Sequence, residues 1–283
     1  MRTVLTVLLT GLLTGLALTS CDTDENSLEG ERWELVWNDE FNGAADTLPN
    51  AANWDYDIGT GDNGWGNNEL QYYTNSVDNV SMNGDGFLAI TGKREVIEDS
   101  QWTSARIVTQ DKFEFLYGRV EARIKLPFGT GLWPAFWMLG YDIDDISWPF
   151  CGEIDVMENF ARSATEISGT IHGPGYSAGD AFGAEYEFPE GEDVTGFHVY
   201  RVDWDPEHIA WYVDDVLYHT AHPGDVNGGW VFDHPFFLLL NLAIGGNPVE
   251  APDESTPDSN EMLVDWVRVY QRVDPIPDPG LEL

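Results

Sequence analysis

The sequence predicts an all-β protein that folds as a single β-sandwich domain, and three observations lead to this fold class. Several segments alternate between apolar and polar residues, as half-buried strands do. A continuous apolar run over residues 236–244 is typical of a strand covered on both faces. No window shows the period of an amphipathic helix, and neither a repeat nor a linker follows residue 32, so the chain is expected to build one large core.

The predicted strands follow in chain order. Residues 120–126 and 200–204 alternate strictly. Residues 211–213 and 216–218 flank Asp214 and Asp215, which predicts a hairpin around an acidic turn. Residues 263–270 form the last strand, and a proline-rich tail, residues 274–283, follows it. Stretches rich in glycine, asparagine and aspartate at 59–68 and 245–260 indicate loops.

The N-terminal segment has the features of an export signal. Residues 1–20 contain a leucine-rich run that is short for a membrane span and end in Leu18-Thr19-Ser20 before Cys21. This ending resembles a lipobox and predicts that Cys21 is diacylated; ordinary cleavage beside an incidental cysteine is the alternative. Residues 21–32 would then be an acidic tether. We expect export and a lipid anchor on the cell envelope, and the acidic tether favours exposure at the cell surface.

The composition is strongly acidic, with 50 Asp and Glu against 13 Lys and Arg and a net charge of −37. This balance argues against a nucleic-acid partner and against an anionic membrane surface, so membrane contact is expected only through the lipid anchor. A well-solvated secreted protein and adaptation to high salt both explain the charge. Beyond Cys21 only Cys151 remains, so no intrachain disulfide is expected, and Cys151 is predicted to be a buried core residue rather than a nucleophile.

Three carboxylates lie close together in an apolar segment. Glu153 and Asp155 share a face of a strand, because side chains alternate. Glu158 would point the other way under regular pleating, but a β-bulge around Val156 and Met157 would return it to the same face. Mutual repulsion among such carboxylates raises at least one pKa. An exposed acidic strand is the simpler alternative.

This arrangement meets the requirement of a retaining glycosidase, in which one carboxylate attacks the sugar and a carboxylic acid protonates the leaving oxygen. The two carboxyl groups must lie about 5–5.5 Å apart. Residues five apart on an extended strand are separated by about 13–16 Å between Cα atoms, so strand curvature and converging side chains would have to bring Glu153 and Glu158 together.

At this point the residues resemble glycoside hydrolase family 16, in the form whose catalytic segment is bulged. The resemblance runs from about Trp33 to Gln271 and includes five further motifs in order, at residues 35–41, 64–74, 131–138, 169–173 and 240–247. Together they are most similar to bacterial laminarinases, which are endo-acting β-1,3-glucanases with a concanavalin A-like β-jelly-roll fold. The resemblance implies a catalytic domain over residues 33–273.

The family resemblance implies roles for individual residues. Glu153 would be the nucleophile, Glu158 the general acid and then base, and Asp155 a hydrogen-bond partner of the nucleophile. His172 would lie near the acids, with a core histidine as the alternative. Six further residues match substrate-binding positions: Trp133, Trp137, Trp148, Asn67, Asn68 and Arg106. The tryptophans could instead belong to the core, and Arg106 could be a surface ion-pair partner.

The resemblance implies no cofactor for catalysis and a structural calcium at Glu40, Gly86 and Asp265, although Asp265 could simply face solvent. The expected partner is a neutral polysaccharide, and a monomer is expected. Pro248-Val249-Glu250 departs from the tryptophan that many laminarinases carry after the position of Asn247. A red-algal galactan hydrolase, a transglycosylase and a non-catalytic β-glucan-binding lipoprotein are the alternative functions.

Overall fold

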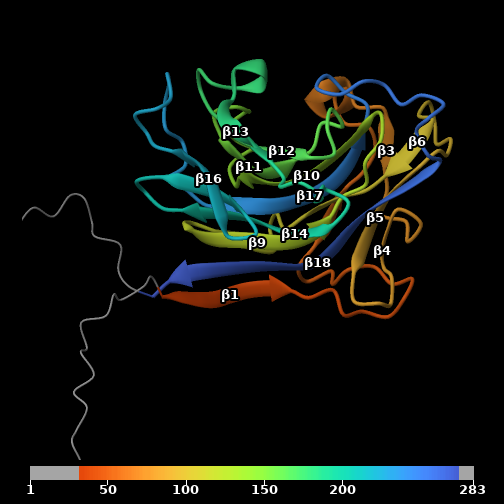
Figure 1. The fold of residues 1–283 in the computed structure, drawn as a ribbon, viewed down its shortest axis with the longest axis horizontal. Helices are drawn as coiled ribbons and strands as arrows, with labels where there is room; N and C mark the ends of the chain where they lie inside the picture. Colours follow the sequence, from red (N-terminus) through yellow and green to blue (C-terminus); the bar gives the residue numbers. More distant parts are fainter. Residues whose placement is uncertain (1–31, 274–283) are drawn as a thin grey trace, which may run out of the picture.

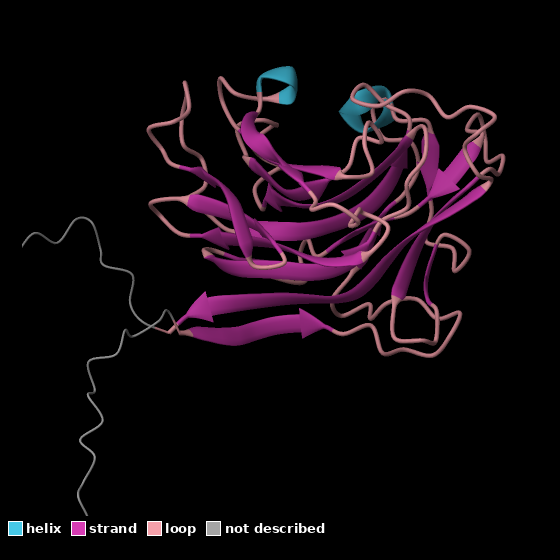
Figure 2. Ribbon diagram, viewed as in Figure 1, coloured by secondary structure: helices cyan, strands magenta, loops and turns pink. Residues whose placement is uncertain are grey.

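A computed structural model of the chain describes residues 32–273. Within this range the protein consists of two stacked sheets (Figure 1), in which every strand pair is antiparallel except β3 (Gln71–Tyr73) with β6 (Trp102–Ser104), and strands dominate the ribbon (Figure 2). This is the jelly-roll sandwich expected from the sequence. The predicted signal peptide, Cys21, most of the tether and the proline-rich tail lie outside the described residues.

The larger sheet has ten strands in the order β16-β15-β14-β9-β18-β5-β6-β3, with β1 paired to β18 and β4 paired to β5. Its strands are β1 (Trp33–Asp39), β3 (Gln71–Tyr73), β4 (Val80–Met82), β5 (Leu88–Lys93), β6 (Trp102–Ser104), β9 (Gly118–Lys125), β14 (Phe197–Trp204), β15 (Ile209–Val213), β16 (Val216–Ala221) and β18 (Ser259–Arg272).

The smaller sheet has eight strands in the order β13-β12-β11-β10-β17-β7-β2, and β8 also pairs with β17. Its strands are β2 (Asp55–Asp57), β7 (Arg106–Val108), β8 (Glu114–Phe115), β10 (Leu132–Gly140), β11 (Glu153–Glu158), β12 (Glu166–His172), β13 (Phe182–Glu187) and β17 (Phe236–Ile244). The only helical segments of the described chain are two short turns, η1 (Gly64–Asn68) and η2 (Ala178–Asp180), coloured cyan in Figure 2.

The core lies between the two sheets, and its strands follow the sequence patterns. β9 alternates buried and half-buried residues along its whole length. All nine residues of β17 are buried, as a continuous apolar run requires. Leu238 and Leu240 belong to the main core, whereas Phe237 and Leu239 pack on the other face of the sheet. Both strand predictions are confirmed.

Strand β14 differs from its expected half-buried pattern. Arg201 and Asp203 are 7% and 9% exposed, although alternation predicts that they face solvent. They are covered because they form ion pairs, Asp203 with Arg119 at 2.7 Å and Arg201 with Asp215. The predicted hairpin is confirmed, and Asp214 in its turn has φ of 47°, a conformation that short hairpin turns require.

Cys151 is fully buried, as predicted, and burial raises the pKa of its thiol to about 12. A thiol with such a pKa is a poor nucleophile. Across residues 32–273, no helix is long and apolar enough to cross a membrane.

Candidate active site

The predicted β-bulge is present in β11. On one side Trp137 pairs with Asp155 and Phe136 with Met157, so Val156 is an extra residue. On the other side Asp155 pairs with Thr170 and the next paired residue is Glu158. Val156 and Met157 are both buried in the main core. The bulge therefore returns Glu158 to the face that already carries Asp155 and Glu153.

The strand register places the predicted site residues in rows across this face of the smaller sheet. Glu153 pairs with His172 of β12. Asp155 pairs with Trp137 of β10. Glu158 pairs with Ala135, which also belongs to β10. Ala135 pairs in turn with Asn241 of β17, and Asn241 pairs with Arg106 of β7. Residues far apart in sequence thus share one surface because β12, β11, β10, β17 and β7 lie in this order in the sheet.

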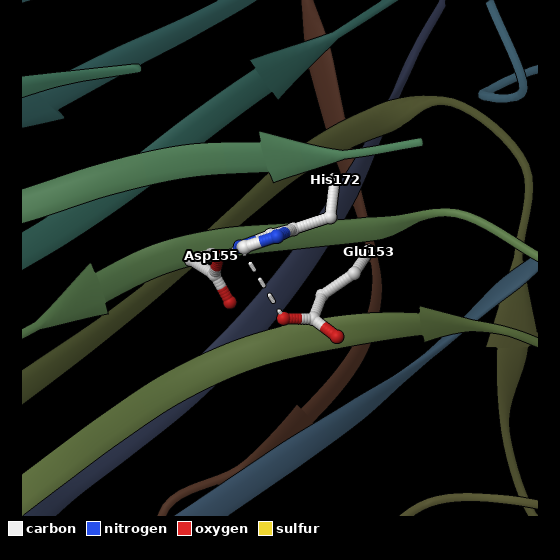
Figure 3. A group of neighbouring side chains, drawn as sticks. All are labelled: Glu153, Asp155 and His172. Atoms are coloured by element: carbon white, nitrogen blue, oxygen red, sulfur yellow. Dashed lines mark ion pairs between the residues drawn. The ribbon is translucent and has the colours of Figure 1, made fainter. Parts of the chain in front are cut away.

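Glu153, Asp155 and His172 form the centre of this surface (Figure 3). His172 Nε2 lies 3.0 Å from Asp155 Oδ2 and 3.6 Å from Glu153 Oε1. The hydroxyl of Thr170 donates a hydrogen bond to Asp155, and the indole of Trp148 donates one of 2.9 Å to Glu153 Oε2. The backbone N–H of Ala178 lies 3.0 Å from His172 Nδ1 and donates to that nitrogen when the ring is neutral, the form in which the Nε2 proton faces Asp155. Both carboxylates are therefore held in place by donors.

Burial and mutual charge raise the pKa values of the two glutamates. For Glu153, desolvation is the largest cause and the charge of Asp155 adds to it, giving a pKa of about 7. The same two causes raise the pKa of Glu158 well above its ordinary value, although Trp133 donates a 2.9 Å hydrogen bond to its Oε1. Burial and the charge of Asp155 therefore favour the protonated form of Glu158, while Glu153 can ionise near neutral pH.

His172 has the opposite electrostatic environment. Burial lowers its pKa, but the charge of Glu153 and the hydrogen bond and charge of Asp155 outweigh burial and raise the pKa to about 10. The carboxylates therefore favour the protonated imidazole, in which Nδ1 carries a proton and no longer accepts from Ala178, and the positive charge of that form lowers the pKa values of both glutamates.

The same three side chains also have the composition of a metal site, since their ligating atoms lie within 4.8 Å of one another. Metal binding requires a neutral imidazole, because a protonated nitrogen has no lone pair to offer. A metal ion here would have to displace the proton that Glu153 and Asp155 stabilise on His172. Without a metal, the cluster has the arrangement of an ion pair beside a second carboxylate.

The three tryptophans lie in different settings. Trp148 is 40% exposed beside Glu153, so part of its ring can meet a ligand. Trp133 is half-buried and bonds Glu158. Trp137 is half-buried, and its indole donates a 2.7 Å hydrogen bond to Asn241. All three lie on or beside the surface that carries the carboxylates, as predicted for sugar-stacking residues.

Arg106 forms an ion pair, but not on an open surface. Its guanidinium lies 2.7 Å from Asp57 and its side chain is only 12% exposed. It also stacks over the ring of Trp65 at 4.2 Å and lies 5.5 Å from the centroid of Trp137. Arg106 therefore packs beside Trp137 at one end of the site, with most of its charge directed at Asp57.

Asn67 and Asn68 belong to the η1 turn, which meets the loop after β17. The backbone oxygen of Asn67 accepts a 2.7 Å hydrogen bond from the N–H of Asn247, and Asn68 Nδ2 donates one of 2.8 Å to Asn247 Oδ1. Gly246 fits between Trp133 and Asn67, since a Cβ there would lie 3.2 Å and 3.3 Å from them. The turn thus borders the site near Trp133.

The predicted calcium residues are engaged in other contacts. Arg268 donates two hydrogen bonds of 2.9 Å to the carboxylate of Glu40, and Arg123 pairs with Asp265 Oδ2. Because an arginine already neutralises the Glu40 carboxylate, that side chain is poorly suited to bind a cation. Backbone carbonyl oxygens of Glu40 and Gly86 and the second oxygen of Asp265 have the chemistry that calcium prefers. The calcium site stays a prediction.

Sequence reasoning missed three residues that contact the site. Thr170 could have been found, because it alternates with His172 on the same strand. Asn241 is the one polar residue inside the apolar run of β17, a visible signal that was not used. Trp211 lies in the core and donates a 2.8 Å hydrogen bond to the backbone oxygen of Asp155. No sequence pattern indicates that contact.

A sandwich whose sheet presents two glutamates of raised pKa on one face, beside tryptophan rings that bond to them, has the form of a carbohydrate-cleaving enzyme. The model of glycosyl hydrolases family 16 matches residues 65–268. The chain belongs to this family.

Known proteins similar to this chain agree with that membership. A beta-glucanase of Rhodothermus marinus is 38% identical, with 95% of each chain covered. A glucan endo-1,3-beta-glucosidase of Cryptopygus antarcticus is 40% identical over 84% of this chain and 92% of its own. The solved laminarinase catalytic domain from Thermotoga maritima MSB8 is 42% identical, covers 86% of this chain and 100% of its own, and superposes with a TM-score of 0.82.

Proposed function

We propose that this protein is an endo-β-1,3-glucanase that hydrolyses laminarin-like or mixed β-1,3/1,4-glucans with retention of configuration. The observation that carries the proposal is the pair of glutamates on one face of the bulged strand, with the pKa of Glu153 raised to about 7 and that of Glu158 raised well above its ordinary value. Retaining hydrolysis needs one ionised and one protonated carboxyl group at the same pH.

In the proposed mechanism Glu153 attacks the anomeric carbon while Glu158 protonates the departing glycosidic oxygen. A covalent glycosyl-enzyme forms on Glu153, and Glu158, now ionised, takes a proton from water as that water releases the sugar. Asp155 and His172 form an ion pair beside the nucleophile at 3.0 Å. The positive charge of His172 stabilises the ionised form of Glu153, and the Trp148 hydrogen bond orients it.

Charge and aromatic residues support a neutral polysaccharide as the substrate. A net charge of −37 disfavours sulfated chains, because like charges repel. Trp133 and Trp148 present indoles next to the two glutamates, and the apolar faces of glucose rings pack on such surfaces. The similarity to beta-glucanases and a laminarinase favours glucan over galactan, and the presence of both glutamates argues against a binding protein without activity.

One panel of assays tests the proposed activity. Reducing ends released from laminarin, lichenan, agarose and carrageenan are measured for the wild type and for Glu153→Gln and Glu158→Gln. We expect release from laminarin and lichenan, and a loss of at least about 100-fold in either variant. Release from agarose alone would assign the activity to galactan. No release from any polysaccharide, or wild-type rates in either variant, would refute the proposal.

We also propose that the enzyme is exported, lipidated at Cys21 and attached to the cell envelope, on the evidence of the apolar leader and the residues before Cys21. The acidic tether supports exposure on the outer surface. Mass spectrometry of the mature protein should show an N-terminal cysteine that carries acyl chains. An unmodified Cys21 would contradict lipidation.

We further propose that calcium, when bound, is held by carbonyl groups of Glu40 and Gly86 and by Asp265, with no part in catalysis. This rests on the oxygen-rich donor set that these residues supply. Dialysis against EDTA should lower the melting temperature, and added calcium should restore it. An unchanged melting temperature would contradict a structural calcium.

A further inference from the structure

The backbone carbonyl of Asp155, beside the bulge in β11, is contacted from across the core. A bulge disrupts the hydrogen-bond ladder of its strand locally, so a contact from another element helps to hold the backbone there in one conformation. Here the oxygen of Asp155, the residue just before the extra Val156, accepts a 2.8 Å hydrogen bond from Trp211 Nε1. Trp211 belongs to β15 of the opposite sheet and is fully buried. The bond therefore crosses the core and ends at the bulge.

A glycine makes room for this contact. Because Asp155 pairs with Thr170 and Glu158 with Ser168, Gly169 alone faces the two bulged residues. A Cβ on Gly169 would lie 2.5 Å from Trp211 Cδ1, 2.8 Å from its Nε1 and 2.3 Å from the hydroxyl of Tyr218. Its backbone lies in a regular strand, so an alanine would be rejected for lack of space rather than for its conformation.

We propose that Trp211, seated against Gly169, is a positioning residue that fixes the bulge and thereby sets where Glu158 lies relative to Glu153. The reason is geometric: the bulge alone turns Glu158 onto the face that carries Glu153, so whatever fixes its backbone also fixes the separation of the two carboxyl groups. A misplacement of about 1 Å can cost about 100-fold in rate. The inference rests on the proposed retaining mechanism and adds a residue to it.

The chain offers a matched control. Trp204 is also a core tryptophan of the larger sheet, 2% exposed, and its indole donates a 3.1 Å hydrogen bond to a backbone carbonyl, that of Phe232. That carbonyl is not in β11. Trp211→Phe and Trp204→Phe each remove one indole and one indole-to-carbonyl bond from the same core, so both should lower the melting temperature.

Two substrates separate positioning of Glu158 from loss of folded enzyme. Laminarin has a poor leaving group that needs the proton of Glu158. The second substrate is 2,4-dinitrophenyl β-laminaribioside, whose dinitrophenolate leaves without taking up a proton. For both, kcat/KM reports the first chemical step, attack by Glu153. In Trp211→Phe we expect kcat/KM to fall at least about tenfold on laminarin but less than about threefold on the dinitrophenyl substrate. Trp204→Phe should keep both values near the wild type.

Equal losses on the two substrates, or rates in Trp211→Phe that match those of Trp204→Phe, would overturn the inference. Should Trp211→Phe fail to fold, Gly169→Ala gives the decision. The added methyl group pushes the Trp211 indole out of its position, while the tryptophan itself stays in the sequence. The Gly169→Ala variant should show the same difference between substrates, and wild-type kcat/KM on laminarin would overturn the inference. A wild-type enzyme that cleaves neither substrate would instead refute the proposed function itself.

Discussion

His172 offsets the repulsion among the carboxylates of this site. Three carboxylates placed together in a buried region would each resist ionisation. The imidazolium, 3.0 Å from Asp155 and 3.6 Å from Glu153, supplies the one positive charge at the centre. Its own pKa rises to about 10, since the charges of the two carboxylates outweigh its burial. The histidine therefore keeps the pKa of Glu153 within reach of neutral pH.

Removing this charge should shift the pH dependence of catalysis. In wild type, kcat/KM should rise as pH passes through about 7, where Glu153 ionises, and fall at higher pH as Glu158 loses its proton. His172→Gln removes a positive charge that favours the ionised forms of Glu153 and Glu158. Both the rise and the fall of the pH profile should therefore move to higher pH, the rise by about one pH unit. The measurement is kcat/KM on laminarin against pH.

His222→Gln is a suitable control, because His222 is exposed and pairs with Asp225 in a turn. Its profile should coincide with that of the wild type. A rise that stays in place in His172→Gln, or that moves to lower pH, would contradict the electrostatic role given to His172.

The catalytic acids and their common face could be predicted from sequence, since alternation and one extra residue determine which way Glu158 points. Their hydrogen-bond partners were harder to predict. Which carbonyl the Trp211 indole reaches depends on how two sheets pack, and no local pattern encodes that. The pairing of Glu40 with Arg268 likewise depends on the register between β1 and β18.

Among the strands, β17 connects the core to the site. It is the central neighbour of β10 and β7, and all nine of its residues are buried. One face packs in the main core, while Asn241 on the other accepts a hydrogen bond from Trp137. The long apolar run predicted this double burial. The buried β14 pair, Arg201 and Asp203, was not predicted, because ion pairing overrode alternation there.

A cavity in β17 should destabilise the whole domain. Leu238 is fully buried, so Leu238→Ala should lower the free energy of unfolding by about 3 kcal/mol through lost apolar contact and the cavity left behind. Leu217→Ala, at a site 53% exposed in the β15–β16 hairpin, should change it by less than about 0.5 kcal/mol. Urea titrations measure both. Similar losses at the two sites would contradict the assignment of β17 to the core.

At the scale of the molecule, acidic residues greatly exceed their possible partners. Arginines of the described chain meet carboxylates in ion pairs, among them Arg94 with Asp258 at 2.7 Å and Arg119 with Asp203 at 2.7 Å. The net charge of −37 shows how many acids remain without a basic counterpart. Composition alone predicted this excess, although it could not predict which few acids would be buried in the site.

This excess should make stability depend on salt. Repulsion among surface carboxylates destabilises the folded state, and salt screens it, with a Debye length of about 10 Å at 0.1 M and about 3 Å at 1 M. The melting temperature should therefore rise by about 5 °C or more between 0.05 and 1 M NaCl, with the same rise in KCl. A flat or falling curve in both salts would count against adaptation to high salt.

The central claim is that Glu153 forms a covalent bond with the sugar while Glu158 moves protons. The most direct test is to trap that bond with a 2-deoxy-2-fluoro-β-laminaribiosyl fluoride, whose fluorine slows release of the sugar more than its attachment. Peptide mass spectrometry then locates the added disaccharide. The account predicts the label on Glu153, within β11 (Glu153–Glu158). A label on Glu158 or Asp155 would contradict it.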